Sequence, residues 1–253
     1  MRYALYSDVH AFPPALEAVL ADAASQKAGV RLCLGDVVGY GPDPSGAVKL
    51  CREASDVVVA GNHDAAVAYL VSTSNFIPRA REAVDRHRGQ LSGEDTDWLA
   101  NLPMSVEREN FVAAHGEFHR SHGRMEAGFG YVLSAGDAAK TLDALPSGID
   151  VAFVGHTHAA CVWAMGPRDG LPRLLPPERF ALEEGFRYVV NIGAVGYPRY
   201  HNETIYVIYD SKARSVEFRR IPFDYPRYMA AILKEDIDPP LWIVNHILDA
   251  DQE

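Results

Sequence analysis

Five short polar motifs in this 253-residue chain each follow a run of apolar residues. They are Asp8-Val9-His10, Gly35-Asp36, Gly61-Asn62-His63-Asp64, His115-Gly116 and Gly155-His156-Thr157-His158. Their side chains are mainly carboxylates and imidazoles, which suit Mn²⁺, Fe²⁺ or Zn²⁺, and no cysteine occurs in them. Asp8 and His10 are two residues apart, so in an extended segment both point to the same side, and the same holds for the two histidines of the last motif. These residue types favour a site for two divalent metal ions.

Predicted strands would bring these motifs together. Apolar runs typical of buried strands lie at 2–7, 30–34, 56–60, 110–114 and 151–154. Helix-like stretches lie at 14–24, 44–54, 65–101 and 137–145, the third with breaks near Pro78 and Gly93. Each motif begins directly after one of the five strands. Because loops beyond the carboxyl ends of neighbouring strands converge on one crevice, five distant segments can supply one site.

The second half of the chain has a different pattern. Residues 166–177 are rich in Pro and Gly and indicate a loop, and residues 224–249 indicate two short helices separated by Pro239 and Pro240. Strand-like runs without long helices between them lie at 160–164, 188–192, 204–209 and 215–221. A β-α-β first half followed by a strand-rich second half predicts an α/β fold with two packed sheets flanked by helices.

Composition limits the class of protein. Apolar residues make up 48% of the chain and charged residues 23%, as in a soluble globular protein. The formal charge of −10 makes long nucleic acid an unfavourable partner. No apolar stretch approaches the roughly 18 residues of a membrane span, and the N-terminus lacks a signal-peptide pattern. Cys33, Cys51 and Cys161 show no paired spacing, which favours a reducing, cytoplasmic location.

The five motifs occur in the order D-x-H, G-D, G-N-H-D, H and G-H-x-H, and in this the chain resembles the calcineurin-like metallophosphoesterases over about its first 210 residues. The resemblance is closest to a bacterial and archaeal branch described as diadenosine-tetraphosphatase-like. That branch shares G-D-V-V-G-Y-G-P-D-P at 35–44 and N-I-G-A-V-G-Y-P-R at 191–199. The resemblance implies a four-layer α-β-β-α sandwich of two mixed sheets. We expect this domain to cover residues 1–221, with a C-terminal helical extension over 222–253.

The resemblance also implies two divalent transition-metal ions as cofactors, with Mn, Fe or Zn favoured and Ni or Co as further options. It assigns one ion to Asp8, His10 and His158, the other to Asn62, His115 and His156, and a bridging position to Asp36. A hydroxide bridging the ions would attack phosphorus. His63 would stay free of metal and donate a proton to the leaving oxygen. Asp64 either orients His63 or caps the following helix.

Several positions depart from the family pattern or leave alternatives open. Gly39 and Tyr40 stand where protein phosphatases of this superfamily have Asp and Arg, which disfavours a phosphoprotein substrate. Phe12 could stack on a substrate or pack in the core, and Arg199 could contact phosphate or form a surface ion pair. The segment 116–131 is unusually long, and within it His119 and Arg120 could form a basic rim that contacts substrate or could belong to a solvated loop.

The resulting functional hypothesis is a metal-dependent phosphoesterase acting on a small phosphorylated molecule, such as a nucleotide, a dinucleoside polyphosphate or a phosphomonoester. One alternative is a phosphodiesterase for cyclic nucleotides or nucleic-acid ends, and another is a non-catalytic protein-binding scaffold. Apolar residues of the C-terminal extension could cover the same domain or pair with a partner subunit in a homo-oligomer. The sequence leaves these alternatives open.

Overall fold

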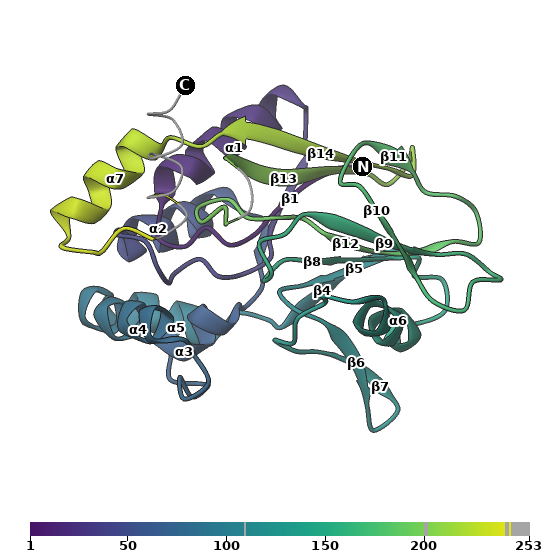
Figure 1. The fold of residues 1–253 in the computed structure, drawn as a ribbon, viewed down its shortest axis with the longest axis horizontal. Helices are drawn as coiled ribbons and strands as arrows, with labels where there is room; N and C mark the ends of the chain where they lie inside the picture. Colours follow the sequence, from purple (N-terminus) through teal and green to yellow (C-terminus); the bar gives the residue numbers. More distant parts are fainter. Residues whose placement is uncertain (109, 200–201, 241–242, 244–253) are drawn as a thin grey trace.

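The computed structural model describes residues 1–108, 110–199, 202–240 and 243, which form two six-stranded sheets and a separate hairpin (Figure 1). The first sheet has the order β11 (Phe180–Ala181), β14 (Ser215–Pro222), β13 (Glu203–Asp210), β1 (Arg2–Tyr6), β2 (Val30–Cys33) and β3 (Val57–Val58). The second has the order β10 (Arg173–Leu175), β9 (Cys161–Met165), β12 (Arg187–Asn191), β8 (Val151–Val154), β5 (Phe111–Ala114) and β4 (Ser105–Glu107).

Both sheets are mixed, and each contains three neighbouring parallel strands. Strands β1, β2 and β3 run parallel, while β13 pairs with β1 in the antiparallel direction. Strands β5, β8 and β12 also run parallel, and β4 and β9 flank them antiparallel. The carboxyl ends of the parallel strands in each sheet therefore lie at one edge, where the polar motifs follow them.

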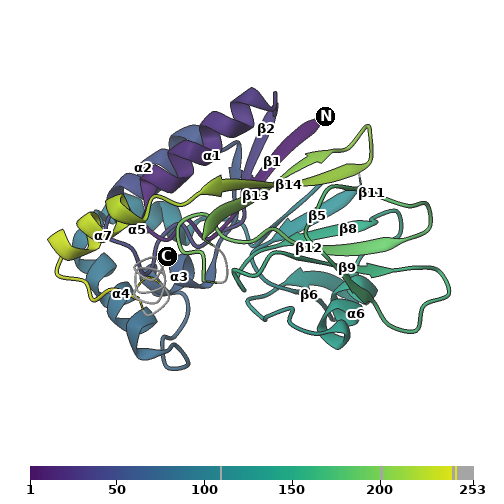
Figure 2. The ribbon, with the colours of Figure 1, turned by 45° about the horizontal axis from the view of Figure 1, so that its top comes forward.

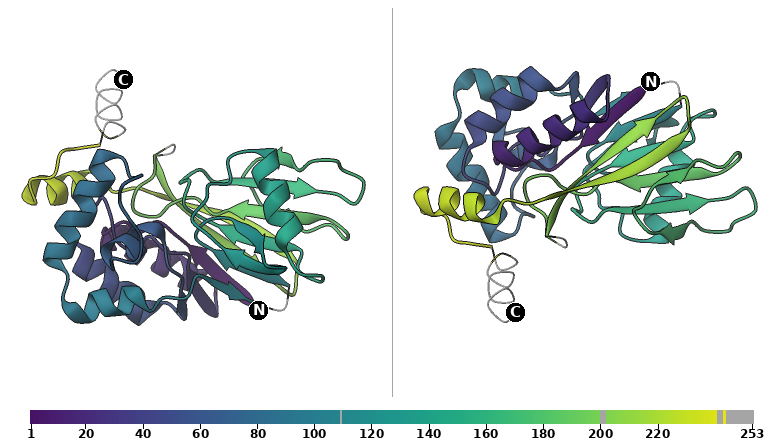
Figure 3. Two further views of the ribbon diagram at one scale, coloured as in Figure 1. Left: turned by 90° about the horizontal axis from the view of Figure 1, so that it is seen from below. Right: turned by 90° about the horizontal axis from the view of Figure 1, so that it is seen from above.

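The described helices lie on the outer faces of the two sheets and at one end of the molecule. They are α1 (Pro13–Ser25), α2 (Pro44–Ala54), α3 (Asn62–Val67), α4 (Pro78–Gln90), α5 (Gly93–Ala100), α6 (Ala135–Ala144) and α7 (Tyr225–Lys234). Figure 2 shows α1 and α2 beside the first sheet and α6 beside the second. Figure 3 shows α3, α4, α5 and α7 gathered at the end of the molecule away from α6.

Three apolar clusters correspond to the three interfaces between these layers. Leu5, Leu32 and Val207 of the first sheet pack with Phe153 and Val190 of the second between the two sheets. A second cluster joins the outer face of the first sheet to α1, α2, α4 and α7. A third joins the outer face of the second sheet to α6. The four-layer α-β-β-α sandwich expected from the sequence is therefore confirmed.

Local sequence signals explain where several helices begin. Helix α2 starts at Pro44, and the Asp43 side chain accepts a hydrogen bond from the Gly46 N–H, which is otherwise unpaired at a helix start. At the start of α5 the bonding is reciprocal: the Asp95 N–H donates to the Ser92 hydroxyl, and the Ser92 N–H donates to the Asp95 carboxylate. These caps fix the helix ends close to the positions that the sequence predicts.

Some predicted elements differ from the structure. The segment 166–177 is not wholly a loop, because Arg173–Leu175 forms β10 against β9. Helix α3 begins at Asn62, three residues before the predicted stretch 65–101, so the third motif lies on a helical turn. The first of the two C-terminal helices is α7, while most of the stretch after Pro240 lies outside the described residues. Within the described chain, no helix has the length and apolar character needed to cross a membrane.

Residues of the C-terminal segment pack against the rest of the chain. Phe223, Tyr228 and Ile232 belong to the apolar cluster on the outer face of the first sheet. The Tyr228 ring centroid lies 4.8 Å from that of Phe12, at the start of α1. The division into a domain over residues 1–221 and an extension over 222–253 stays a prediction.

Candidate metal centre and active site

The loops that follow β1, β2, β3, β5 and β8 meet at one place between the two sheets. Backbone hydrogen bonds hold neighbouring loops together: the Asp8 N–H donates to the Gly35 carbonyl at 3.0 Å, and the His10 N–H donates to the Asp36 carbonyl at 3.0 Å. In the second sheet the Gly155 N–H donates to the His115 carbonyl at 2.9 Å. The convergence expected from the positions of the motifs at strand ends is observed.

Several of the candidate ligands have a backbone conformation that is rare for residues with a side chain. The φ angles are 58° for Asp8, 45° for His10, 51° for Asp36, 68° for His156 and 61° for His158. Each such residue costs of order 1–3 kcal/mol, and such residues cluster at functional sites. Backbone strain at these residues lowers local stability, and the strained conformations direct the five side chains toward the same site.

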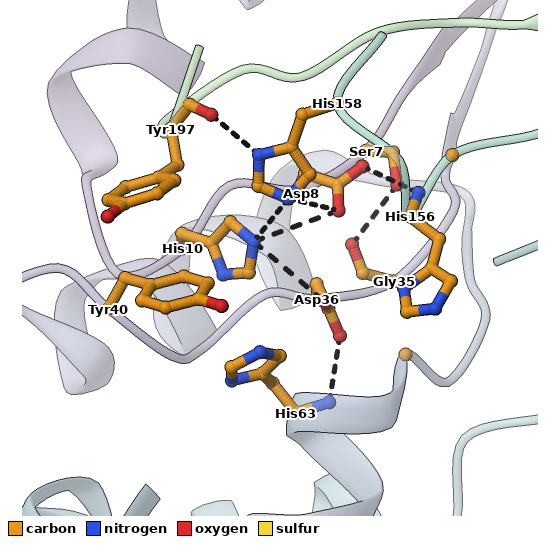
Figure 4. Close-up of polar contacts among 12 residues, drawn as sticks. Ser7, Asp8, His10, Gly35, Asp36, Tyr40, His63, His156, His158 and Tyr197 are labelled. Carbon is orange, nitrogen blue, oxygen red and sulfur yellow. Dashed lines mark hydrogen bonds and ion pairs between the residues drawn. The ribbon is translucent and has the colours of Figure 1, made fainter. Parts of the chain in front are cut away.

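The first cluster joins Asp8, His10 and His158, all of which are buried (Figure 4). The two Nε2 atoms of His10 and His158 face each other at 3.0 Å, and the His158 Nε2 lies 3.2 Å from an Asp8 carboxylate oxygen. The opposite nitrogen of each ring is near a backbone carbonyl, Val38 O at 2.9 Å for His10 and Tyr197 O at 2.6 Å for His158. Donation from Nδ1 to these carbonyls would leave both Nε2 lone pairs directed into the cluster, as in a metal site.

The second cluster joins Asp36, His115 and His156, which are also buried. The His115 Nε2 lies 3.3 Å from the Asp36 carboxylate, 3.0 Å from the His156 Nδ1 and 3.1 Å from the Asn62 Oδ1. Four donor atoms thus meet at one point. The other nitrogen of His115 lies 2.7 Å from the Leu34 carbonyl, which can fix its tautomer.

Asp36 lies between the two clusters. Its carboxylate is 3.7 Å from the His10 Nε2 of the first cluster and 3.3 Å from the His115 Nε2 of the second. The Asp8 Oδ1 atom is buried; it lies 3.2 Å from the His158 Nε2 but accepts no hydrogen bond among the described residues. Facing imidazole lone pairs and a buried carboxylate oxygen that accepts no hydrogen bond are what a cation would satisfy. These residues therefore fit two divalent ions.

The electrostatics of the second cluster also favour a cation. Burial works against a charge on His115, but the neighbouring Asp36 outweighs burial and raises the pKa of His115 to about 10. Burial likewise disfavours the charged form of Asp36, yet His115 holds the pKa of Asp36 well below its ordinary value. By contrast, burial lowers the pKa of His156 to about 3. Burial also lowers the pKa of His10 in the first cluster, so both imidazoles are neutral ligands near pH 7.

His63 lies beside both clusters but belongs to neither of them. Its backbone N–H donates to the Asp36 Oδ1 at 2.9 Å, whereas its side-chain Nδ1 has no hydrogen-bond partner among the described residues (Figure 4). Its ring is packed among the rings of Tyr40 at 4.8 Å, Phe76 at 5.1 Å and His10 at 5.1 Å. Ring packing thus holds this imidazole.

The Asp64 carboxylate bonds to backbone groups rather than to the His63 ring. It accepts hydrogen bonds from the backbone N–H groups of Gly61 at 3.0 Å and Val38 at 3.1 Å. These bonds close the first turn of α3 and attach the helix to the loop after β2. Of the two alternatives for Asp64, the structure shows the helix cap, and the orienting contact with His63 is not present among the described interactions.

Arg199 lines the cavity beside the two clusters. Its guanidinium donates to the Tyr40 hydroxyl at 2.8 Å and lies over the Tyr40 and Tyr197 rings at 5.3 and 5.4 Å. Arg199, Asn62 and His63 line the same cavity, which has a volume of about 360 Å³. The structure therefore places a fixed positive charge beside the two clusters, as expected if Arg199 contacts phosphate.

Three other candidate substrate contacts are placed elsewhere. Phe12 is buried, and its ring packs on Phe223 at 5.4 Å and on Tyr228 at 4.8 Å, so it is a core residue and the prediction of substrate stacking is wrong. His119 and Arg120 lie on β6 (Phe118–Ser121), which pairs with β7 (Arg124–Ala127). The Arg120 Nε donates to a backbone carbonyl of α6 at 3.0 Å, and neither residue lines the cavity.

The segment 116–131 still contributes to the site, but through aromatic residues at its end. Phe129 and Tyr131 line the cavity, and the Tyr131 ring stacks on His156 with centroids 3.9 Å apart and planes at 10°. Tyr40 and Phe76 complete the aromatic lining. The sequence analysis did not predict these contacts. The signal that could have indicated them is the presence of Phe129 and Tyr131 in an unusually long segment directly after His115.

Comparison with known proteins agrees with this geometry. A family model described as calcineurin-like phosphoesterase matches residues 1–160, which include all five motifs. The chain belongs to this family. Membership supports a hydrolase that cleaves phosphoesters, and the two clusters support metal ions as its cofactors.

Relatives of this calcineurin-like phosphoesterase extend the likeness over nearly the whole chain. The protein MJ0912 of Methanocaldococcus jannaschii is 30% identical over 241 residues, covering 95% of this chain and 94% of that protein. A metallophosphoesterase from Sphaerobacter thermophilus is 31% identical with a TM-score of 0.79, covering 96% of this chain and 97% of that one. The hypothetical protein PH1004 of Pyrococcus horikoshii shares the fold at 16% identity, with a TM-score of 0.70 and 96% coverage of each chain.

Proposed function

We propose that this protein is a dinuclear-metal-dependent phosphoesterase that hydrolyses a small phosphorylated molecule. The observation that carries the proposal is the arrangement of two buried histidine–carboxylate clusters that meet at Asp36, with His63 and Arg199 at the adjoining cavity. A protein-binding scaffold of this fold would not need such a complete set of inward-facing donors. The proposal therefore favours catalysis over the scaffold alternative.

The proposed ligands form two groups. Asp8, His10 and His158 would hold one ion; Asn62, His115 and His156 would hold the other; and Asp36 would serve both. Carboxylate, imidazole and amide donors suit Mn, Fe or Zn, and also accept Ni or Co. When bound, two such ions would lower the pKa of a water molecule between them and so supply a nucleophile near neutral pH.

The remaining side chains would act on the substrate. Arg199, held by the Tyr40 hydroxyl at 2.8 Å, would bind a phosphate oxygen and orient the ester. His63 would donate a proton to the leaving oxygen, because its imidazole borders the cavity and its Nδ1 is not engaged by another described residue. Asp64 would keep the turn that carries His63 in place through its two backbone hydrogen bonds.

The substrate class follows from size and charge. A cavity of about 360 Å³ is near the lower end of the range of about 300–1,000 Å³ for small-molecule sites. The net charge of −10 opposes long polyanions. Nucleotides, dinucleoside polyphosphates and simple phosphomonoesters remain the proposed candidates, and the alternative is a phosphodiesterase for cyclic nucleotides or nucleic-acid ends. The free state of Cys33, Cys51 and Cys161 is consistent with the proposed cytoplasmic location.

The test is hydrolysis of p-nitrophenyl phosphate and bis(p-nitrophenyl) phosphate with Mn²⁺, Fe²⁺, Zn²⁺, Co²⁺ or Ni²⁺ added in turn. We expect metal-dependent turnover, and the ratio of the two rates separates a monoesterase from a diesterase. His63→Ala should keep both metal ions and lose about 10²–10⁴-fold in kcat. His119→Ala is the matched control, because this histidine lies outside the cavity. Lack of turnover with all five metals, or a fully active His63→Ala, would contradict the proposal.

A further inference from the structure

One side of the cavity beside His63 is formed by uncharged residues. Val71, Phe76, Ile77 and Ala80, from the segment between α3 and α4 and the start of α4, line it and are here called the apolar wall. The Phe76 ring centroid lies 5.1 Å from that of His63. The apolar wall is therefore in direct contact with the imidazole that is proposed to protonate the leaving oxygen.

The charges around this cavity are one-sided. Among the described lining residues, Arg199 is the single side chain with a permanent charge, and none is a carboxylate. Ser72 and Asn75 add neutral polar groups beside the apolar wall. With Arg199 engaged by the phosphate, a second anionic group placed against this wall would lose hydration without gaining an opposite charge, which is costly.

We propose that the apolar wall is the leaving-group subsite, and that it selects phosphate esters of an uncharged alcohol that carries an aromatic ring. This inference rests on the proposed function. A proton donor must be within hydrogen-bond reach of the leaving oxygen, so the group attached to that oxygen lies next to His63. The neighbour of His63 on the cavity side is Phe76, and flat rings pack favourably on aromatic side chains. Alcohols that carry a second anionic group are disfavoured.

The size of the cavity limits this group further. About 360 Å³ must hold the phosphate together with whatever lies against the apolar wall. That volume is adequate for one ring system but is close to the minimum for a small-molecule site. Ser72 and Asn75 can hydrogen-bond to heteroatoms at the edge of a ring, which suits a nucleobase as well as a simple aryl group.

The experiment compares inhibitors that differ only beyond phosphorus. Inhibition constants of phenylphosphonate and methylphosphonate are measured on the metal-loaded enzyme, with p-nitrophenyl phosphate as substrate. The wild type should bind the phenyl compound more tightly, and Phe76→Ala should reduce this preference by about three- to tenfold. Taking the ratio of the two constants cancels any change in His63 or in the metals. Leu174→Ala is the matched control, since Leu174 is 59% exposed on β10 and does not line the cavity.

A second variant tests the charge argument without removing an aromatic ring. Ile77 is 57% exposed, so Ile77→Lys can place an ammonium group at the apolar wall with little effect on folding. This variant should bind phosphonoacetate at least about threefold more tightly relative to methylphosphonate than the wild type does. Turnover of phenyl phosphate and of a nucleoside monophosphate then distinguishes a simple aryl group from a nucleobase.

Failure of the proposed function and failure of the leaving-group subsite give different results. If no ester is hydrolysed with any metal, the proposed function is wrong and the leaving-group subsite with it. If esters are hydrolysed but the phenyl preference is the same in wild type and Phe76→Ala, the proposed function stands and the leaving-group subsite is wrong. An unchanged phosphonoacetate ratio in Ile77→Lys would also contradict the subsite.

Discussion

His87 on α4 holds the loop that carries Tyr40. This histidine is fully buried; its Nδ1 accepts a hydrogen bond from the Gly39 N–H at 3.0 Å, and its Nε2 lies 3.0 Å from the Gly41 carbonyl. The Nε2 donates to the Gly41 carbonyl, and the Nδ1 can accept from Gly39 only while the imidazole is neutral, so protonation breaks the bond to Gly39. Burial lowers the pKa of His87 from 6.5 to about 3. Acid should therefore weaken the attachment of this loop.

The size of the effect follows from the two pKa values. Between pH 6.5 and 3 the unfolded chain carries a proton on this residue that the folded chain does not. Stability from His87 is therefore complete above pH 6.5 and is lost as the pH falls through this window. The slope approaches about 1.4 kcal/mol per pH unit, so the loss between pH 7.5 and pH 5 is about 2 kcal/mol.

The assay is urea unfolding of the wild type and of His87→Gln at pH 7.5 and pH 5, under identical metal conditions. Gln can present an amide oxygen to Gly39 and an amide N–H to Gly41, but it does not titrate. Other buried groups titrate equally in both proteins, so the difference in unfolding free energy isolates His87. That difference should change by about 2 kcal/mol in favour of the variant on going to pH 5. A difference that is independent of pH would refute this account of His87.

Further predictions concern the residues around the site. Gly39→Ala should lower kcat while metal content stays normal, because the added Cβ would clash with the His63 Nδ1 and the φ angle of +94° strains any side chain. An unchanged kcat would show that the placement of His63 does not matter. Phe12→Ala should lower the free energy of unfolding by about 3–5 kcal/mol in denaturant titrations, with KM unchanged, and a raised KM would restore a substrate role. Arg199→Ala should raise KM about tenfold or more in steady-state kinetics, whereas Arg120→Ala should not, and equal effects would contradict the assignment of the phosphate contact.

The parts of the fold and site that the sequence predicts are those set by local signals. The strand before each motif lies in a mainly apolar run, and α2 spans Pro44–Ala54 as expected because Asp43 and Pro44 mark its start. The candidate ligands follow strand ends, where parallel topology leaves little choice of position. These signals are contained within a few consecutive residues.

The parts that the sequence does not predict depend on tertiary contacts. Phe12 follows the first motif, and only the packing of Phe223 and Tyr228 shows that it faces the core. The hairpin of β6 and β7 carries His119 away from the cavity and returns the chain so that Tyr131 reaches His156. The second hydrogen bond of Asp64, which attaches α3 to the loop after β2, joins it to Val38, 26 residues away in sequence. No local pattern contains this information.

The central claim is that two divalent ions lie on either side of Asp36, and metal content measures it most directly. Elemental analysis of the protein after equilibration with Mn²⁺ or Zn²⁺ and removal of free metal should give two ions per chain. His10→Ala and His156→Ala should each retain one ion, because each removes a ligand of a different cluster, while Asp36→Asn should lose affinity for both. Fewer than two ions in the wild type, or loss of the same ion in both histidine variants, would contradict the account.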